Sequence, residues 1–142
     1  MSQKKILVPL GASAKDLKTV HYALSLAERL HAQVYILQQT AVTDGENPLT
    51  VWLEEALLDL INSARQAGLT VAYYIAPRML EEEIVGLIKG EGIDVLVFGE
   101  DDGFCERRLL QIKPLIPSQI IQVNKKNQVS YLAEEGGSKW QS

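Results

Sequence analysis

The chain has 142 residues, of which 46% are hydrophobic and 23% are charged, and its formal net charge at pH 7 is −4. One domain of this length can bury about two-thirds of the surface that its unfolded chain exposes. The acidic balance and the scattered lysines and arginines argue against nucleic-acid binding, while the single cysteine, Cys105, excludes a disulfide framework and a CxxC metal or redox pair.

The first half of the chain alternates predicted strands with predicted helices. Residues 6–10 and 34–37 are short apolar runs, which are typical of buried strands. Between them, apolar residues recur with helical spacing. A long helix is predicted over residues 48–67, because Pro48 suits a first helical turn and the glycine that follows supplies a stop. Trp52, early in this helix, is expected to be partly buried.

The second half continues the alternation. A β-rich run is followed by a helix that starts near Pro77, by a nearly continuous apolar run, by a shorter helix and by a last strand. These three strands and the shorter helix are predicted at residues 69–75, 93–98, 120–123 and 104–112. An uninterrupted apolar strand is typical of the centre of a parallel sheet that is covered on both faces.

Alternating strands and helices in this order predict an α/β domain with three layers (α/β/α), built on a five-stranded, parallel, doubly wound sheet. We assign residues 1–124 to this domain. Residues 125–142 are polar, so we expect a tail with room for one edge strand, at the weak alternation of residues 129–132, and disordered beyond it. The apolar runs are too short for a signal peptide or a bilayer span, so a cytoplasmic protein without membrane contact is expected.

The loop from Gly99 to Gly103 follows the central apolar strand and carries three carboxylates between its glycines. In an open parallel sheet, backbone amides of this turn usually bind phosphate. Two like charges about 4 Å apart repel by about 1 kcal/mol in water and by about 4 kcal/mol at a partly buried site. A micromolar ligand binds with roughly 8 kcal/mol of free energy, so three carboxylates facing a triphosphate would cancel most of its binding. We therefore interpret Asp101 and Asp102 as caps of the following helix, with a bridged divalent cation or a partner contact as alternatives.

The sequence contains no recognisable catalytic or metal-binding arrangement. His21 and His31 lie ten residues apart without metal-ligand spacing, and Ser13 and Ser118 lack an obvious base. Cys105 is interpreted as buried filler rather than as a reactive thiol, because its neighbours are acidic. We expect no catalytic residue and no metal site.

Several segments, in their order and spacing, resemble the universal stress proteins. The resemblance rests on KILVPL at residues 5–10, YALSLAERLHA at 22–32, VYIL at 34–37, IDVLVFG at 93–99, RRLL at 107–110 and residues 117–123, and it covers roughly residues 4–124. It implies a Rossmann-like domain of the adenine nucleotide alpha hydrolase-like type, often homodimeric through its last strand. It also implies one of two subtypes, with or without ATP binding.

This sequence departs from the pattern of the ATP-binding subtype at each of its positions. That pattern is an Asp after the first strand, then Gly-x-x-Gly, nine residues, and Gly followed by Ser or Thr. Here Gly11 replaces the Asp, three residues separate Gly99 from Gly103, and Lys113-Pro114 replaces the Gly-Ser pair. The resemblance therefore implies the subtype without robust ATP binding, and no cofactor is expected.

The expected function is that of a non-catalytic regulatory or interaction module in stress response. A homodimer is expected through the last strand, at Ile120, Ile121, Gln122 and Val123, because an unpaired apolar edge invites a second copy. An unidentified protein partner is also compatible with this reading.

Two other functions are weighed against it. The first is an ATP or AMP sensor whose crevice lies at the carboxyl ends of the strands, at Pro9, Leu10, Gly11, Gly99 and Gly103. The second is a hydrolase of the wider adenine-nucleotide group. It ranks last, because the sequence has no acid–base pair, no triad and no P-loop, and a fold alone does not establish chemistry.

Overall fold

The computed structural model describes residues 3–10, 17–39, 48–76, 81–99, 111–123 and 129–131. Its strands form one sheet in the order β3-β2-β1-β4-β5-β6. They are β1 (Lys5–Leu10), β2 (Gln33–Gln39), β3 (Val71–Ala76), β4 (Val95–Gly99), β5 (Gln119–Val123) and β6 (Val129–Tyr131). The first five strands are parallel, which confirms the predicted sheet, and β6 adds an antiparallel sixth.

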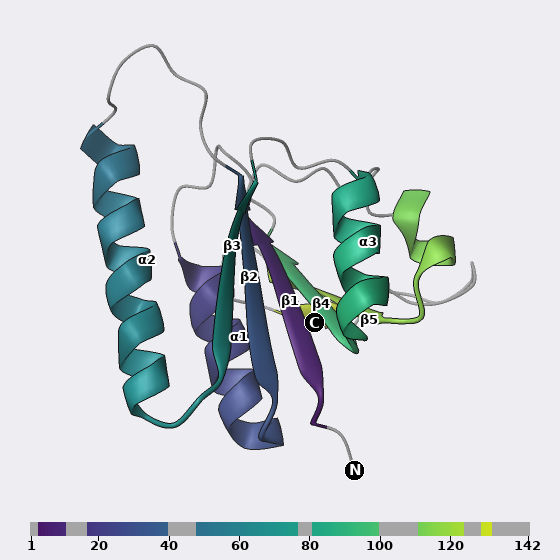
Figure 1. Cartoon of the computed structure of the whole chain (residues 1–142), viewed down its shortest axis with the longest axis horizontal. Helices are drawn as coiled ribbons and strands as arrows, with labels where there is room; N and C mark the ends of the chain where they lie inside the picture. The colour runs from purple at the N-terminus through teal and green to yellow at the C-terminus, as the bar shows by residue number, and fades with distance from the viewer. Residues whose placement is uncertain are drawn as a thin grey trace.

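Helices lie on both faces of this sheet. Helices α1 (Lys18–Leu30) and α2 (Pro48–Gln66) cover one face, and α3 (Glu81–Glu91) with the short 3-10 helix η1 (Lys113–Leu115) lies on the other (Figure 1). The long predicted helix at residues 48–67 is therefore confirmed to within one residue. Of the helix predicted over residues 104–112, the structure describes only the last two residues, which are helical. None of the described helices is both long and apolar enough to cross a membrane.

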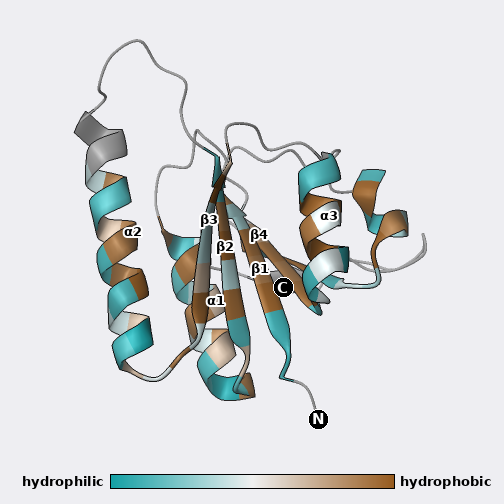
Figure 2. Ribbon diagram, in the orientation of Figure 1, coloured by the Kyte–Doolittle hydropathy of each residue, from teal (hydrophilic) through white to brown (hydrophobic). Residues whose placement is uncertain are grey.

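The core is divided by the sheet into two apolar clusters. Alternate residues of β1 point to opposite faces, so Ile6 and Val8 pack with α1 and α2, whereas Leu7 packs with α3. All five residues of β4 are buried, as the apolar run at residues 93–98 predicted for a central strand. Hydrophobic residues occupy the strands and one side of each helix ribbon (Figure 2), and those of them that are buried form the two clusters.

The last parallel strand is not an edge of the sheet, contrary to the assumption behind the predicted dimer contacts. Strand β6 pairs antiparallel with β5 along Ile121, Gln122 and Val123. The side chains of Ile120, Ile121 and Val123 are buried within the chain, and that of Gln122 is partly exposed. A dimer built on the backbone of β5 would first have to displace β6. The dimer itself stays a prediction.

Candidate functional site

The predicted crevice lies where the chain reverses its direction across the sheet. From β1 the chain moves outward through β2 to β3, and it then returns to the other side of β1 to form β4. In open α/β sheets, ligands bind outside the carboxyl ends of the strands at such a switch point. The carboxyl ends of β1 and β4 are therefore the edge at which a nucleotide site is to be sought.

Pro9 separates the ends of these two strands. The amide of Gln33 donates to the carbonyl of Lys4 at 2.8 Å, so even-numbered residues of β1 face β2 and odd-numbered ones face β4. The nitrogen of Pro9 consequently points toward β4 but has no hydrogen to donate. The residue pairs between β1 and β4 end at Leu7 and Leu96. The proline thus ends the ladder at the place where a crevice would open.

The structure brings three of the predicted crevice residues to this edge. Pro9, Leu10 and Gly99 lie at the carboxyl ends of the adjacent strands β1 and β4, and all three are buried. Gly11 and Gly103, together with the carboxylates of the acidic loop, lie outside the described residues. The described part of the crevice is therefore an apolar floor without a charged or polar side chain from these positions.

Lys113 and Pro114 belong to η1, and three residues separate η1 from the amino end of β5. There, Ser118 Oγ donates to the carbonyl of Ile93 at 2.7 Å and the amide of Gln119 donates to the carbonyl of Asp94 at 3.0 Å. Gly99 is at the opposite, carboxyl end of β4. The chain therefore passes from η1 to the amino edge of the sheet, whereas Gly99 lies at its carboxyl edge.

The amino end of α1 is the one described helix terminus that follows β1 at the carboxyl edge. Its N-cap residue, Leu17, makes no side-chain capping hydrogen bond, and its first turn contains no acidic residue. Backbone amides at a helix N-terminus carry partial positive charge, which favours an anion nearby. This is the described feature that most favours a phosphate at this edge.

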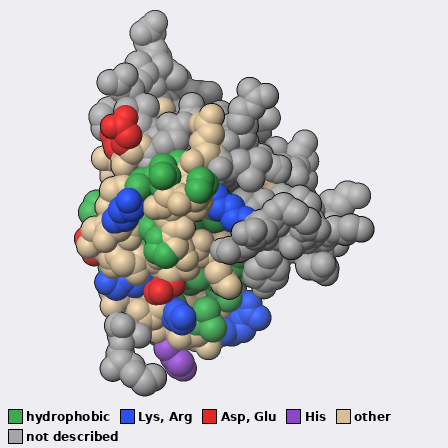
Figure 3. Space-filling model, turned by 90° about the vertical axis from the view of Figure 1, so that its right-hand side faces the viewer, with side chains coloured by type: hydrophobic (Ala, Val, Ile, Leu, Met, Phe, Trp, Pro, Cys, Tyr) green, Lys and Arg blue, Asp and Glu red, His purple; other side chains and the backbone are tan. Residues whose placement is uncertain are grey.

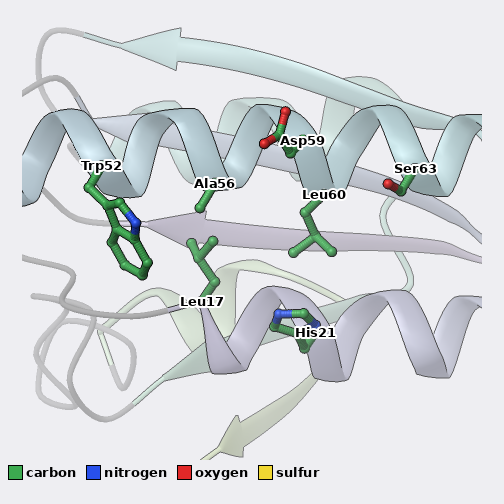
Figure 4. Close-up of a pocket in the computed structure, with 7 residues that line it drawn as sticks. All are labelled: Leu17, His21, Trp52, Ala56, Asp59, Leu60 and Ser63. Atoms are coloured by element: carbon green, nitrogen blue, oxygen red, sulfur yellow. The ribbon is translucent and has the colours of Figure 1, made fainter.

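A groove of about 410 Å³ lies between α1 and α2 and was not foreseen from the sequence. Residues of α2 at helical spacing face α1 across it, with Trp52 at the amino end of the helix (Figure 4). The groove is lined by Leu17, His21, Trp52, Ala56, Asp59, Leu60 and Ser63. Trp52 is 62% exposed, which corrects the expectation that it is partly buried.

The groove contains a serine, a histidine and an aspartate, but they do not form a triad. His21, Asp59 and Ser63 are all exposed, and no hydrogen bond joins them among the described residues. The carboxylate of Asp59 points away from His21, on the far side of α2 (Figure 4). A nucleophile needs its base within hydrogen-bond reach, and the base needs a third group to orient it. The groove is therefore suited to hold an apolar group rather than to activate a nucleophile.

Charges elsewhere on the described residues do not gather into a second site. Within the described ranges, no three His, Cys, Asp or Glu side chains are grouped so that they could hold a metal ion. On the face that carries α3, lysines and arginines are spread among acidic and apolar side chains (Figure 3). Such an arrangement lacks the continuous positive stripe that a nucleic-acid phosphate backbone requires.

Two tyrosines, on the neighbouring strands β2 and β3, have raised pKa values. Burial raises the pKa of the Tyr35 hydroxyl above its ordinary value of 10.0, and the charge of Glu91, whose carboxylate accepts a hydrogen bond from this hydroxyl at 3.4 Å, raises it further. Burial likewise raises the pKa of Tyr73, with a smaller contribution from Glu54. The Tyr73 hydroxyl donates to Gln38 Oε1. The folded chain therefore favours the neutral form of both side chains.

We expect the free energy of unfolding to fall as the pH rises above 10. The unfolded chain releases tyrosine protons near pH 10.0, whereas Tyr35 and Tyr73 in the folded chain hold theirs to higher pH. The unfolded state then binds fewer protons, so alkaline pH favours it. Urea titrations between pH 8 and 12 measure this loss. The Tyr73→Phe variant should lose less stability over the same range, and an identical pH profile for the two proteins would contradict the assignment.

No protein-family model matches this sequence, and no curated protein matches it significantly. Solved structures do match it. A universal stress protein in complex with cAMP has a TM-score of 0.58 at 18% identity, covering 87% of this chain and 98% of that one. The universal stress protein from Archaeoglobus fulgidus in complex with dAMP has a TM-score of 0.57 at 15% sequence identity, and the match covers 86% of this chain and 98% of that one. A protein of the universal stress protein family from Arabidopsis thaliana, with AMP bound, has a TM-score of 0.54 at 14% sequence identity, and the match covers 85% of this chain and 91% of that one. At these identities the likeness establishes the fold, which is that of a universal-stress-protein-like domain.

Proposed function

We propose that this chain, which has the fold of universal stress proteins, is a non-catalytic regulatory module of the stress response without robust ATP binding. The observation that carries the proposal is the replacement of the Gly-Ser pair of the ATP-binding pattern by Lys113 and Pro114. These two residues belong to η1, which precedes β5 in the chain. Pro114 also has no amide hydrogen with which to bind a phosphate.

The charge of the neighbouring loop supports the same proposal. Residues 100–102 add three carboxylates between Gly99 and Gly103. Each would repel a triphosphate at the carboxyl edge of the sheet, where the described floor of Pro9, Leu10 and Gly99 supplies no compensating cation. An ATP site here would therefore lack part of its phosphate-binding backbone and would place carboxylates beside the phosphates.

A regulatory role rather than an enzymatic one is supported by the α1–α2 groove. Its apolar residues and the exposed indole of Trp52 form a surface of the kind that holds a partner's apolar side chain. Among the described residues no acid–base pair or oriented nucleophile accompanies it. We place the protein in the cytoplasm, because its one cysteine and its short apolar runs require neither an oxidising compartment nor a membrane.

Calorimetric titration with ATP and with AMP, each with and without Mg²⁺, tests the proposal. We expect no saturable heat with ligand at about 1 mM, which corresponds to binding weaker than about 4 kcal/mol. A universal stress protein that is known to bind AMP, titrated under the same conditions, is the positive control. ATP binding in the micromolar range would overturn the proposal.

The second candidate function is an adenine-nucleotide sensor, and two observations favour it. Three structural neighbours are seen with cAMP, dAMP and AMP, and the amino end of α1, whose first turn has no acidic residue, follows β1 at the carboxyl edge of the sheet. A monophosphate carries less charge than ATP and meets less repulsion from the acidic loop. AMP binding without ATP binding would select this candidate, and loss of AMP binding on Gly99→Val would place it in the crevice.

A further inference from the structure

Strand β3 is the parallel edge of the sheet, and it combines exposed apolar side chains with free backbone groups. It ends the strand order, beside α2 (Figure 1). Ile75 is 58% exposed and Tyr74 is 40% exposed, on opposite faces of the strand. No residue of β3 is charged. Natural edge strands are usually protected by charges, prolines or bulges within them, and β3 has none within its bounds.

The direction of each backbone group in β3 follows from its pairing with β2. The amide of Val34 donates to the carbonyl of Thr70 at 2.9 Å, so even-numbered residues face β2 and odd-numbered residues face outward. Val71, Tyr73 and Ile75 therefore present their N–H and C=O groups at the outer edge. Among the described residues, no strand pairs with β3 on this side.

One of these outward groups is already satisfied. The guanidinium of Arg65 donates to the carbonyl of Val71 from Nε at 3.1 Å and from Nη2 at 2.7 Å. The Val71 carbonyl is therefore already occupied and is not available to a further strand. The backbone groups of Tyr73 and Ile75 remain, and these two residues are a self-complementary pair.

We propose that a second copy of this chain pairs with β3 antiparallel, about a two-fold axis at Tyr74. In this register Tyr73 of one copy lies opposite the partner's Ile75, and the two residues exchange their N–H···O=C bonds. The partner's Tyr73 side chain covers the exposed Ile75. The bond between Arg65 and Val71 stays intact.

The opposite face of the strand supports the same axis. The ring of Tyr74 stacks on that of Tyr35, with centroids 6.4 Å apart and planes 2° from parallel. On the axis Tyr74 becomes a non-hydrogen-bonded pair with the partner's Tyr74, the closest kind of cross-strand pair. The stack of two rings in each copy is then extended across the interface.

Helix α2 supplies the charge complementarity that selects a second copy as the occupant. Arg65 donates to the Val71 carbonyl at the β3 edge, and Glu54 lies near enough to Tyr73 for its charge to raise the pKa of that hydroxyl. Leu58, four residues after Glu54 and seven before Arg65, lies on the same side and is 47% exposed. The two-fold axis places the two α2 helices antiparallel on the same face of the joined sheet, where packed helices lie about 8–10 Å apart. Leu58 then meets the partner's Leu58, and the Arg65 end meets the partner's Glu54 end.

Light scattering over a concentration series tests the proposal, with two matched variants. The wild-type chain should rise from the mass of one chain to that of two. Ile75→Lys, which places like charges on the edge, should raise the dissociation constant at least about tenfold. Leu115→Lys is the control, because Leu115 is 55% exposed on η1, away from β3, and its dissociation constant should equal that of the wild type.

Disulfide trapping identifies the strand that pairs. In a Cys105→Ala background, Tyr74→Cys should cross-link two copies, because Cα atoms of a non-hydrogen-bonded pair lie about 4.5 Å apart. Gln122→Cys on β5 should not. The proposal is overturned if the wild type keeps the mass of one chain, if Ile75→Lys leaves the dimer intact, or if only Gln122→Cys cross-links. Circular dichroism of each variant verifies that it is folded.

Discussion

The Phe98→Ala variant should lose about 3–5 kcal/mol of its free energy of unfolding, the largest single loss that we expect. The Phe98 ring is fully buried, at 0% exposure, in the cluster on the α3 face of the sheet. Strand β4 is held between β1 and β5, so its backbone cannot move in to fill the space that the ring leaves. Domains are typically stable by about 5–15 kcal/mol, so a large part of the total would be lost.

Urea unfolding followed by far-ultraviolet circular dichroism measures this loss. Trp52→Ala is the matched control, because it also removes an aromatic ring, but one that is 62% exposed. It should change the free energy of unfolding by no more than about 0.5 kcal/mol. If both variants lost the same amount, the burial assigned to β4 would be wrong.

The order of strands and helices could be predicted because local patterns determine it. The apolar run at residues 93–98 has no polar face, and only a strand covered on both sides suits it; all of β4 is indeed buried. Helix α2 begins at Pro48, as predicted, and its end differs from the prediction by one residue. A proline at the start and a glycine after the end are signals within the segment itself.

Pairings between distant segments could not be predicted in the same way. Strand β6 forms at the weak alternation of residues 129–132, where the sequence allowed one added edge strand, but no local signal shows that it pairs antiparallel with β5. The groove between α1 and α2 depends on how two helices pack on one face of the sheet, which their separate patterns do not contain. For the same reason Trp52 was expected to be partly buried, although it is largely exposed.

The departures from the ATP-binding pattern can be identified in the sequence, but the elements that carry them cannot. The sequence shows that Lys113-Pro114 replaces a Gly-Ser pair, but only the structure shows that these residues belong to η1, which precedes β5 in the chain. The edge argument for a dimer applies equally to any unpaired strand. From the sequence, residues 120–123 are expected to form the unpaired edge, whereas in the sheet β5 is covered by β6 and β3 is the parallel edge. Sheet order is set by long-range packing, which a linear pattern does not show.

Two adjacent leucines of α2 should respond to the same substitution in different ways. Leu57 is 1% exposed in the cluster on the α1–α2 face, and Leu57→Ala should lower the free energy of unfolding by about 2–5 kcal/mol through lost burial and a residual cavity. Leu58 is 47% exposed, so Leu58→Ala should change it by no more than about 0.5 kcal/mol at concentrations where the chain is a monomer.

In the association of two copies, Leu58→Ala should have a larger effect than Leu57→Ala. Leu58 lies on the proposed two-fold axis, so Leu58→Ala should weaken the dimer in light scattering, while folded Leu57→Ala should form it with the wild-type dissociation constant. Neither leucine differs from the other in residue type or in the helix that carries it. Their opposite responses would therefore follow only from where the two side chains point, because Leu57 packs against the sheet and Leu58 faces the β3 edge. A Leu58→Ala variant that destabilises the monomer as much as Leu57→Ala would contradict this orientation of α2.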